Sequence, residues 1–355
     1  MKLRSALLLV PATLALAAGL LVPATAGGAT ARHGQAPNTL RELAKQQHIK
    51  IGSAVDVTAL ADEADYRRVL NREFNNITAE NAMKWESVEP QRGVFDWSGA
   101  DAIVANAKRN RQTIRGHTLV WHNQLPTWIT DNEANFTAQE LRGILRNHIM
   151  TEAGRYRGQI RAWDVLNEAV ADGGGLRDTI WLRKLGPGYI ADLFRWAHQA
   201  DPHAKLYYND YNLESDQAKY DTMLQIVTDL RKKRVPIHGV GFQGHLDIQF
   251  GFPDFADRMK RVTDLGLEVA ITEADVRMDL PTTDEKLATQ ASYYSQMMTA
   301  CLDNRRCTEY TVWGYTDRHS WVPGFFEGQG AACLFDENLA PKPAYNALLA
   351  LGKRR

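Results

Sequence analysis

Eight short apolar runs recur along this chain, each rich in the β-branched and aromatic residues that favour strands. The predicted strands are Ile49–Val55, Phe74–Asn81, Thr113–Trp121, Ile160–Glu168, Lys205–Asn212, His238–His245, Glu268–Asp275 and Tyr310–Asp317. Between them lie segments with helical spacing of apolar residues, namely Ala64–Phe74, Ala100–Arg111, Thr137–Tyr156, Tyr189–Ala200, Gln217–Lys233, Phe252–Leu265 and Asp284–Leu302, and Pro343–Leu351 closes the chain. Strands that alternate with helices indicate parallel βαβ units, and eight repetitions predict an α/β fold, a single (β/α)8 TIM barrel.

A doubly wound open sheet is the alternative that this alternation leaves open. Such a sheet usually carries a glycine-rich phosphate loop after its first strand. The first strand here reads Ile51-Gly52-Ser53-Ala54, which contains no such loop. The sequence therefore favours the closed barrel.

The N-terminus has the pattern of a secretory signal peptide. Lys2 and Arg4 precede an apolar stretch that ends in Ala24-Thr25-Ala26, a small-x-small cleavage site. A membrane anchor is the alternative, because the apolar stretch is only slightly shorter than a membrane span. We expect a signal peptide over residues 1–26, a flexible leader over 27–38, the (β/α)8 domain over 39–355, and secretion to the cell exterior.

Charge and composition exclude some partners. The chain is formally neutral, and loss of Lys2 and Arg4 would leave 40 basic against 42 acidic residues. This balance offers no electrostatic basis for binding nucleic acid or an anionic membrane. No Ser/Gly/Pro-rich linker interrupts the chain after Leu40, so we expect one domain without an appended module. We also expect a monomer.

Two of the predicted strands end in a glutamate. Trp163-Asp164-Val165-Leu166-Asn167 leads to Glu168, and Val269-Ala270-Ile271-Thr272 leads to Glu273. Barrel enzymes present their catalytic groups at the carboxyl ends of the strands. Glycoside hydrolysis needs two carboxyl groups, one to protonate the leaving oxygen and one to attack or to activate water. The pair therefore predicts a glycosidase.

Polar and aromatic residues collect at the ends of seven strands, where a buried parallel strand would otherwise be apolar. They are Glu80, Asn81, His117, Trp121, His122, Asn167, Glu168, Tyr211, Gln243, His245, Glu273, Trp313 and Asp317. A single glutamate after a strand is usually a helix cap or a solvated group. The joint pattern indicates an active face instead.

Eight strings in the chain carry a family resemblance. They are Thr78-Ala79-Glu80-Asn81, Arg115-Gly116-His117-Thr118-Leu119-Val120-Trp121-His122, Trp163-Asp164-Val165-Leu166-Asn167-Glu168, Tyr208-Asn209-Asp210-Tyr211-Asn212, Val240-Gly241-Phe242-Gln243-Gly244-His245, Ile271-Thr272-Glu273-Ala274-Asp275, Thr311-Val312-Trp313-Gly314 and Asp317-Arg318-His319-Ser320-Trp321. In this order, from Leu40 to Leu351, the chain resembles family 10 of the glycoside hydrolases, the retaining endo-β-1,4-xylanases.

The resemblance implies a role for each catalytic carboxyl group. Glu168 would be the acid/base and Glu273 the nucleophile. In retaining glycosidases the two carboxyl groups stand about 5–5.5 Å apart, and the acid of the first step acts as the base of the second. The implied reaction is cleavage of internal xylosidic bonds in xylan, with no cofactor and no metal.

The resemblance also implies substrate contacts. Asn167 would donate to the sugar 2-hydroxyl, and His245 would hydrogen-bond the nucleophile, with Asp275 orienting it. Polar residues would line the glycone side, and aromatic residues would form walls against the sugar faces, with Tyr211 on the aglycone side. The polar set is Glu80, Asn81, Lys84, His117 and Gln243, and the remaining walls are Trp121, Trp313 and Trp321.

Three alternatives remain open at this point. The same chemistry could act on β-1,4-glucan, or the barrel could bind carbohydrate without cleaving it. A secreted metallohydrolase is disfavoured, because no His-x-His or His/Asp cluster occurs at the strand ends. The chain departs from the family pattern at two places. Ala82 stands where family members often have glutamate, and the segment 277–283 is particular to this chain. Subsite preferences and branch tolerance are therefore undetermined.

The three cysteines lie late in the chain. Cys301 and Cys307 are six residues apart, and an exported chain keeps disulfides, so we expect a local bridge between them. Cys333 is then unpaired and is interpreted as a small apolar core residue rather than a reactive thiol.

Overall fold

The computed structural model describes residues 36–353. The predicted signal peptide and most of the predicted leader therefore lie outside the described residues. Within 36–353, no helix is both long and apolar enough to cross a membrane.

Eight parallel strands close into a barrel, so the predicted (β/α)8 fold is confirmed. Neighbouring strands pair in chain order, and β9 closes the ring by pairing with both β1 and β8. The barrel strands are β1 (Lys50–Val55), β2 (Asn76–Ala79), β3 (Thr113–His117), β4 (Ala162–Asn167), β5 (Lys205–Asp210), β6 (Gly239–Phe242), β8 (Glu268–Asp279) and β9 (Cys307–Val312). Two short strands, β7 (His245–Asp247) and β10 (Gln329–Gly330), flank the distal part of β8.

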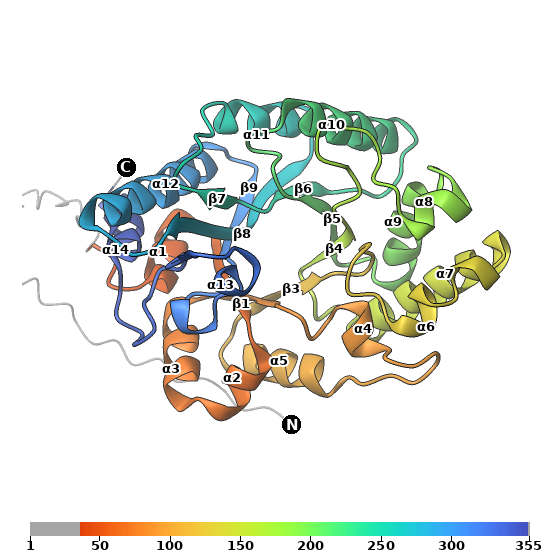
Figure 1. The fold of residues 1–355 in the computed structure, drawn as a ribbon, viewed down its shortest axis with the longest axis horizontal. Coiled ribbons are helices and arrows are strands. Elements are labelled where there is room, and N and C mark those ends of the chain that lie inside the picture. The colour runs from red at the N-terminus through yellow and green to blue at the C-terminus, as the bar shows by residue number, and fades with distance from the viewer. Residues whose placement is uncertain (1–35, 354–355) are drawn as a thin grey trace, which may run out of the picture. The chain divides into compact units, whose positions relative to one another are not determined.

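The main helices lie around the outside of the strands, as Figure 1 shows for α5, α7, α9, α10, α11 and α12. The α-helices are α1 (Leu40–Gln47), α2 (Val57–Asp62), α3 (Ala64–Glu73), α4 (Trp85–Val88), α5 (Ser98–Arg109), α6 (Thr127–Thr130), α7 (Ala138–Arg155), α8 (Ile180–Leu185), α9 (Tyr189–Ala200), α10 (Gln217–Lys232), α11 (Phe255–Asp264), α12 (Asp284–Asp303), α13 (Val322–Phe325) and α14 (Pro343–Ala350). Single 3-10 turns occur at Glu133–Asn135, Asp317–His319 and Leu351–Lys353.

Local sequence signals set several of these boundaries. Thr137 and Glu140 form a capping box at the start of α7, in which each side chain satisfies a backbone N–H of the first turn. Gly266 ends the α11 segment with φ at +80°, a conformation that glycine adopts without steric cost.

One glycine is required by packing between strands. Trp163 of β4 packs over Gly116 of β3, where an added Cβ would lie 2.2 Å from the indole.

Most of the predicted strands end earlier than the apolar pattern suggested, and two of them show why. The run His238–His245 splits into β6 and β7, because Gly244 has φ at +78° and its N–H bonds the Glu214 carboxylate instead of a strand. The run Thr113–Trp121 ends at His117, and the following residues turn over the barrel rim. In both cases the residues beyond the strand end belong to the candidate site.

The barrel interior contains buried charges below this rim. Arg115 is fully buried and bonds both Asp164, with Nε at 3.0 Å from Oδ2, and Glu309, with Nη1 at 3.4 Å from Oε2. Glu309 also accepts from Asn76 and pairs with Arg161. A buried charge is tolerated only when it is paired and hydrogen-bonded, and this network meets that requirement.

Candidate active site

The two glutamates predicted as catalytic lie at the carboxyl ends of their strands. Glu168 directly follows β4 and has φ at +56°, an unusual conformation for a residue with a side chain, of the kind that functional sites often hold. Glu273 lies in β8, two residues after Ile271, the last residue of this strand that pairs with β6. Both carboxyl groups therefore stand at the same end of the barrel.

Glu273 is almost completely buried, at 4% exposed, and its carboxylate is held from three sides. Asn209 donates from Nδ2 to Oε1 at 2.7 Å, and His245 Nε2 lies 3.2 Å from Oε2. His117 Nδ1 is 3.8 Å from Oε1. Burial opposes ionisation, but the charge of His117 and the hydrogen bond from His245 outweigh it and lower the pKa of Glu273. The surroundings of Glu273 therefore favour its ionised form.

His245 is in turn held by Asp275. The His245 Nδ1 atom lies 2.9 Å from Asp275 Oδ2, and Asp275 is buried. Burial lowers the pKa of His245, but the charges of Asp275 and Glu273 dominate and raise it to about 10. The imidazole is therefore a cation between two carboxylates across the neutral pH range.

Glu168 is less buried than Glu273 and has amide partners. Gln243 Nε2 donates to Glu168 Oε1 at 3.1 Å, and Asn167 Nδ2 donates to the same oxygen at 3.3 Å. The Asn167 amide oxygen accepts from Asn209 at 2.9 Å and from Gln243 at 3.3 Å. A continuous chain of amides thus joins the two carboxyl groups across the strand ends.

His117 is fixed by the charges inside the barrel. Its Nδ1 lies 3.0 Å from Asp164 Oδ2, and Asp164 also binds Arg115. Because Nδ1 faces Asp164, the other ring nitrogen is the one left for a ligand. The His117 ring packs edge-on against Trp313, with centroids 5.0 Å apart.

Lys84, one of the predicted glycone-side residues, lies among polar and aromatic side chains. Its ammonium donates to Asn81 Oδ1 at 2.8 Å and to Gln124 Oε1 at 2.6 Å, and it lies 4.9 Å from the ring of Trp121. Burial lowers the pKa of Lys84, against the attraction of Glu273 and Glu80.

Glu80 belongs to the same group of residues. Burial, and after it the charge of Asp56, raise the pKa of Glu80 to about 7, although Lys84 opposes the shift. Near neutral pH, Glu80 can therefore act as a hydroxyl donor or as a carboxylate acceptor toward a polar ligand, and the Lys84 ammonium can donate.

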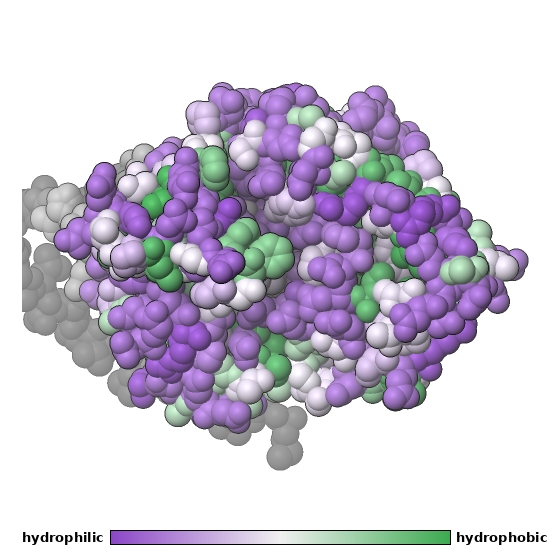
Figure 2. Space-filling view, in the orientation of Figure 1, coloured by the Kyte–Doolittle hydropathy of each residue, from purple (hydrophilic) through white to green (hydrophobic). Residues whose placement is uncertain are grey.

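Aromatic residues follow β9. The ring of Trp321 lies 5.0 Å from that of His245 and 5.2 Å from that of Phe325, which is 71% exposed. Figure 2 shows apolar atoms gathered near α13 on a mostly hydrophilic face. Trp321 thus joins this exposed patch to the partners of Glu273.

The hydroxyl of Tyr211, which follows β5, is anchored by two neighbours. Arg177 donates to the Tyr211 hydroxyl at 2.8 Å, and the hydroxyl donates to Asp172 at 2.9 Å. Arg177 also binds the main-chain oxygen of Glu168 at 2.9 Å. The Lys219 ammonium lies 3.2 Å from the Tyr211 ring centroid. The position of this aromatic ring is thereby tied to that of Glu168.

Hydrogen bonds and ring contacts join most of the predicted residues, and they also involve residues that the sequence did not single out. Asn209, Gln124, Arg177 and Asp164 each bond a predicted site residue. Asn209 and Asp164 lie in strings that carried the resemblance, which was the available signal. Asp317, at the end of a predicted strand, bonds Lys342 and the Cys333 N–H instead of the site.

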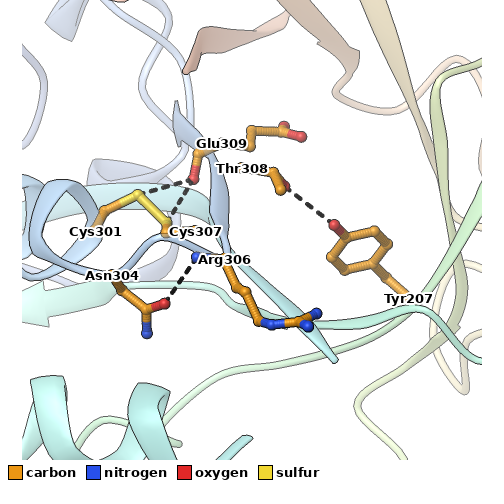
Figure 3. Close-up of a disulfide and its surroundings, with 7 residues drawn as sticks. All are labelled: Tyr207, Cys301, Asn304, Arg306, Cys307, Thr308 and Glu309. Carbon is orange, nitrogen blue, oxygen red and sulfur yellow. Dashed lines mark hydrogen bonds between the residues drawn. A yellow bond between two sulfur atoms is a disulfide. The ribbon is translucent and has the colours of Figure 1, made fainter. Parts of the chain in front are cut away.

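No group of three or more His, Cys, Asp or Glu side chains within residues 36–353 is arranged to hold a metal ion. The predicted disulfide between Cys301 and Cys307 is present, and Cys333 is free and buried. Figure 3 shows that the bridge joins the end of α12 to the start of β9, so it lies at the opposite end of the barrel from Glu273.

A barrel with two buried or half-buried glutamates linked by amides, one of them held ionised, is the site of a glycoside hydrolase. Comparison with known proteins identifies the family. Residues 39–351 match glycosyl hydrolase family 10, and the chain belongs to this family.

Its relatives include an endo-1,4-β-xylanase of Agaricus bisporus, 45% identical over 88% of this chain and 93% of the relative. Endo-1,4-β-xylanase B of Thermotoga neapolitana is 42% identical over 91% and 94% of the two chains. Among solved structures, xylanase 10B of Thermotoga maritima superposes with a TM-score of 0.86 at 43% identity, covering 89% of this chain and 98% of that chain. Xylanase 10B of Thermotoga petrophila, in complex with xylobiose, superposes with a TM-score of 0.85 at 42% identity, covering 89% and 98%.

Proposed function

We propose that this protein is a secreted endo-β-1,4-xylanase that hydrolyses internal bonds of xylan with retention of anomeric configuration. The observation that carries the proposal is the unequal setting of two linked carboxyl groups. Glu273 is buried among cationic and amide donors that favour its charge, whereas Glu168 is half-buried and receives only amide donors. A nucleophile and an acid/base need this division.

In the first step, Glu273 attacks the anomeric carbon and forms a covalent ester. The bond from that carbon to the glycosidic oxygen breaks, and the proton of Glu168 passes to the leaving oxygen. In the second step, Glu168 takes a proton from water, the oxygen of that water bonds the anomeric carbon, and Glu273 leaves. The two inversions restore the β configuration.

Neighbouring side chains assist by position. Asn167 bonds Glu168 through Nδ2 and is proposed to turn this donor to the sugar 2-hydroxyl, a contact that strengthens in an oxocarbenium-like transition state. His245 holds Glu273 in the orientation for attack. We place the preceding sugar against Glu80, Asn81, Lys84, His117 and Gln243, with Trp121, Trp313 and Trp321 as walls and Tyr211 under the following sugar.

The remaining parts of the proposal concern where the enzyme acts. The N-terminal pattern supports secretion after cleavage near Ala26. The balance of charge supports a neutral polysaccharide as partner, with neither nucleic acid nor membrane required. We propose a monomer that needs no cofactor.

The nucleophile is tested by Glu273→Ala with azide. Activity on an aryl xyloside with a good leaving group should disappear in the variant and return with azide, which fills the vacated place and yields the α-glycosyl azide. A β-azide product would move the nucleophile role to another residue. On the unmodified enzyme, proton NMR should detect the β-anomer first, and early α-anomer would contradict retention.

The substrate is tested by parallel assays on xylan and on carboxymethylcellulose. Activity on xylan should dominate, and the early products should be oligosaccharides rather than xylose, because an endo-enzyme cuts inside the chain. Faster cleavage of carboxymethylcellulose would replace xylan by β-1,4-glucan as the substrate. No hydrolysis of either polymer would favour a carbohydrate-binding barrel.

A further inference from the structure

A second pocket lies at the end of the barrel opposite the two glutamates. Lys50 is the first residue of β1, Arg161 directly precedes β4, and Arg305 lies between α12 and β9, so all three stand where strands begin. With Lys45 and His48 from the end of α1, they line a pocket of about 570 Å³. That volume is in the range of small-ligand sites rather than of a single bound ion.

The pocket is basic, and its lining contains no acid. Of ten lining residues, four are lysine or arginine and one is histidine. This concentration stands out in a chain whose basic and acidic residues balance at 42 each. The C-terminus of α1 explains Lys45, since a helix end favours a nearby cation, but it does not explain Lys50 or Arg305.

Three of these cations are uncompensated within the described part of the chain. Lys45, Lys50 and Arg305 make no side-chain hydrogen bond or ion pair there. Arg161 pairs with Glu309, but that carboxylate is already shared with Arg115. Arg161 also keeps a buried Nε without a partner among residues 36–353. Lys45, Lys50 and Arg305 thus supply donors that have no acidic partner among residues 36–353.

The cations also repel one another. Burial, and then the charge of Arg161, lower the pKa of Lys50, and no carboxylate offsets the shift. A bound anion would relieve this repulsion and would accept charge-assisted hydrogen bonds from both side chains. Lys50 and Arg161 are partly buried, so such bonds would be screened less by salt than those of a surface patch.

We propose that this pocket is an oxyanion site, and that its occupant is the carboxylate of a uronic acid carried as a branch of the polysaccharide. The site would hold acidic xylan on the enzyme at a distance from the cleavage face. The choice of a uronic acid branch rests on the proposed xylanase function, whereas the oxyanion site itself does not. The exposure of Lys45, His48 and Arg305 leaves the pocket open to a branch on a long chain.

The first test measures thermal unfolding against inorganic phosphate at constant ionic strength. The unmodified protein should gain melting temperature in a saturable manner, because an anion that binds only the folded state stabilises it. In the double variant Lys50→Gln/Arg305→Gln, phosphate affinity should fall roughly tenfold or more, as expected when charged donors are lost. Lys232→Gln/Lys233→Gln, which removes two exposed cations at the end of α10, should keep the full effect.

An equal phosphate effect in all three proteins, or none in the unmodified protein, would overturn the site. The single variant Lys50→Gln guards against loss of folding. Because it removes a charge that Arg161 repels, its melting temperature without phosphate should equal or exceed that of the unmodified protein, while its phosphate response should weaken. A lower melting temperature with an unchanged response would also count against the proposal.

The second test separates a uronic acid from a free anion. Glucuronic acid should compete with phosphate, and xylose should not. In a Glu273→Ala background, the Lys50→Gln/Arg305→Gln change should weaken retention on glucuronoxylan but not on neutral arabinoxylan. Phosphate binding without competition by glucuronic acid would overturn the assigned occupant. In the protein that retains Glu273, hydrolysis of an aryl xylobioside should be the same with and without the double change. Failure of the anion site is therefore distinct from failure of the proposed activity.

Discussion

The indole of Trp321 donates a hydrogen bond to Asp275, with Nε1 and Oδ2 2.7 Å apart. The same carboxylate oxygen lies 2.9 Å from His245 Nδ1. One buried carboxylate therefore holds both the imidazole that pairs with Glu273 and the Trp321 indole beside that imidazole. A shared partner therefore influences both the charge on Glu273 and the position of the Trp321 indole.

Trp321 should govern discrimination between xylose and glucose units. These differ by the C6 hydroxymethyl group, so selectivity must come from exclusion of that group rather than from extra attraction to xylose. Trp321→Ala should raise the ratio of aryl-cellobioside to aryl-xylobioside kcat/KM by a factor that corresponds to about 1–3 kcal/mol. It should also lower kcat/KM for the xylobioside itself. Trp321→Phe, which keeps a ring but loses the donor to Asp275, should shift the ratio less. An unchanged ratio in Trp321→Ala would place selectivity among the glycone-side polar residues.

His245→Asn should move the acid limb of the kcat/KM profile to higher pH. The imidazolium lowers the pKa of Glu273, and Glu273 attacks only when ionised, so removing the cation makes the carboxylate protonate at higher pH. The measurement is a pH series on an aryl xylobioside. Asn209→Ala serves as a comparison that removes a neutral donor. A limb that stays in place for His245→Asn would separate the histidine from the ionisation of Glu273.

The same histidine should make the free energy of unfolding decrease as the pH rises into the alkaline range. The pKa of His245 in the folded protein is raised to about 10, well above that of an unfolded histidine, about 6.5. Its contribution is thus complete below pH ~6.5 and is lost as the pH rises through about 10. Denaturant unfolding at several pH values should show the unmodified protein losing its advantage over His245→Asn across this interval. A constant difference between the two proteins would contradict the raised pKa.

Asn209 should matter to catalysis although it was not among the predicted contacts. Its amide bonds the buried Glu273 carboxylate at 2.7 Å. Asn209→Ala should lower kcat/KM by a factor that corresponds to about 1.5–3 kcal/mol of transition-state stabilisation, the range for a hydrogen bond to a charged group. Asn209→Asp should lower kcat/KM further and should move the acid limb of the kcat/KM profile to higher pH, because a second carboxylate would face Glu273. Full activity in Asn209→Ala would show that the other partners suffice.

Glu168→Ala should affect substrates according to their leaving groups. General acid help matters most for a poor leaving group and typically contributes 10²–10⁴-fold. The loss should therefore approach that range on xylan and be much smaller in the glycosylation step of a dinitrophenyl xylobioside. Pre-steady-state kinetics separates that step from hydrolysis of the intermediate. Equal losses on both substrates would contradict the acid role.

The disulfide should contribute modestly to stability. Cys301 and Cys307 are separated by six positions, and closing so short a loop is worth about 2 kcal/mol in the chain-entropy estimate. Cys301→Ser/Cys307→Ser should lower the melting temperature by a few degrees without loss of activity, because the bridge lies far from Glu273. Without reductant, only Cys333 should react with an alkylating agent, and only after unfolding, since it is buried.

The sequence by itself was sufficient for the barrel and for the position of Glu168 and Glu273 at the carboxyl ends of two strands. Strand and helix spacing is a local property, and the carboxyl end of a parallel strand is at once a position in sequence and a position on the active face. Glu168 and Glu273 could thus be placed from their own strands. The Cys301–Cys307 bridge was equally local.

Only the tertiary structure decided which side chains meet. Asn209 and Glu273 lie on β5 and β8, and Trp321 reaches Asp275 across 46 positions of sequence. The uncompensated cations Lys50 and Arg305 likewise come from opposite ends of the chain. No periodicity encodes these contacts, because they arise when the barrel closes and brings distant strand ends together. The charge that each side chain carries is then set by those neighbours and by burial, neither of which exists before the chain has folded.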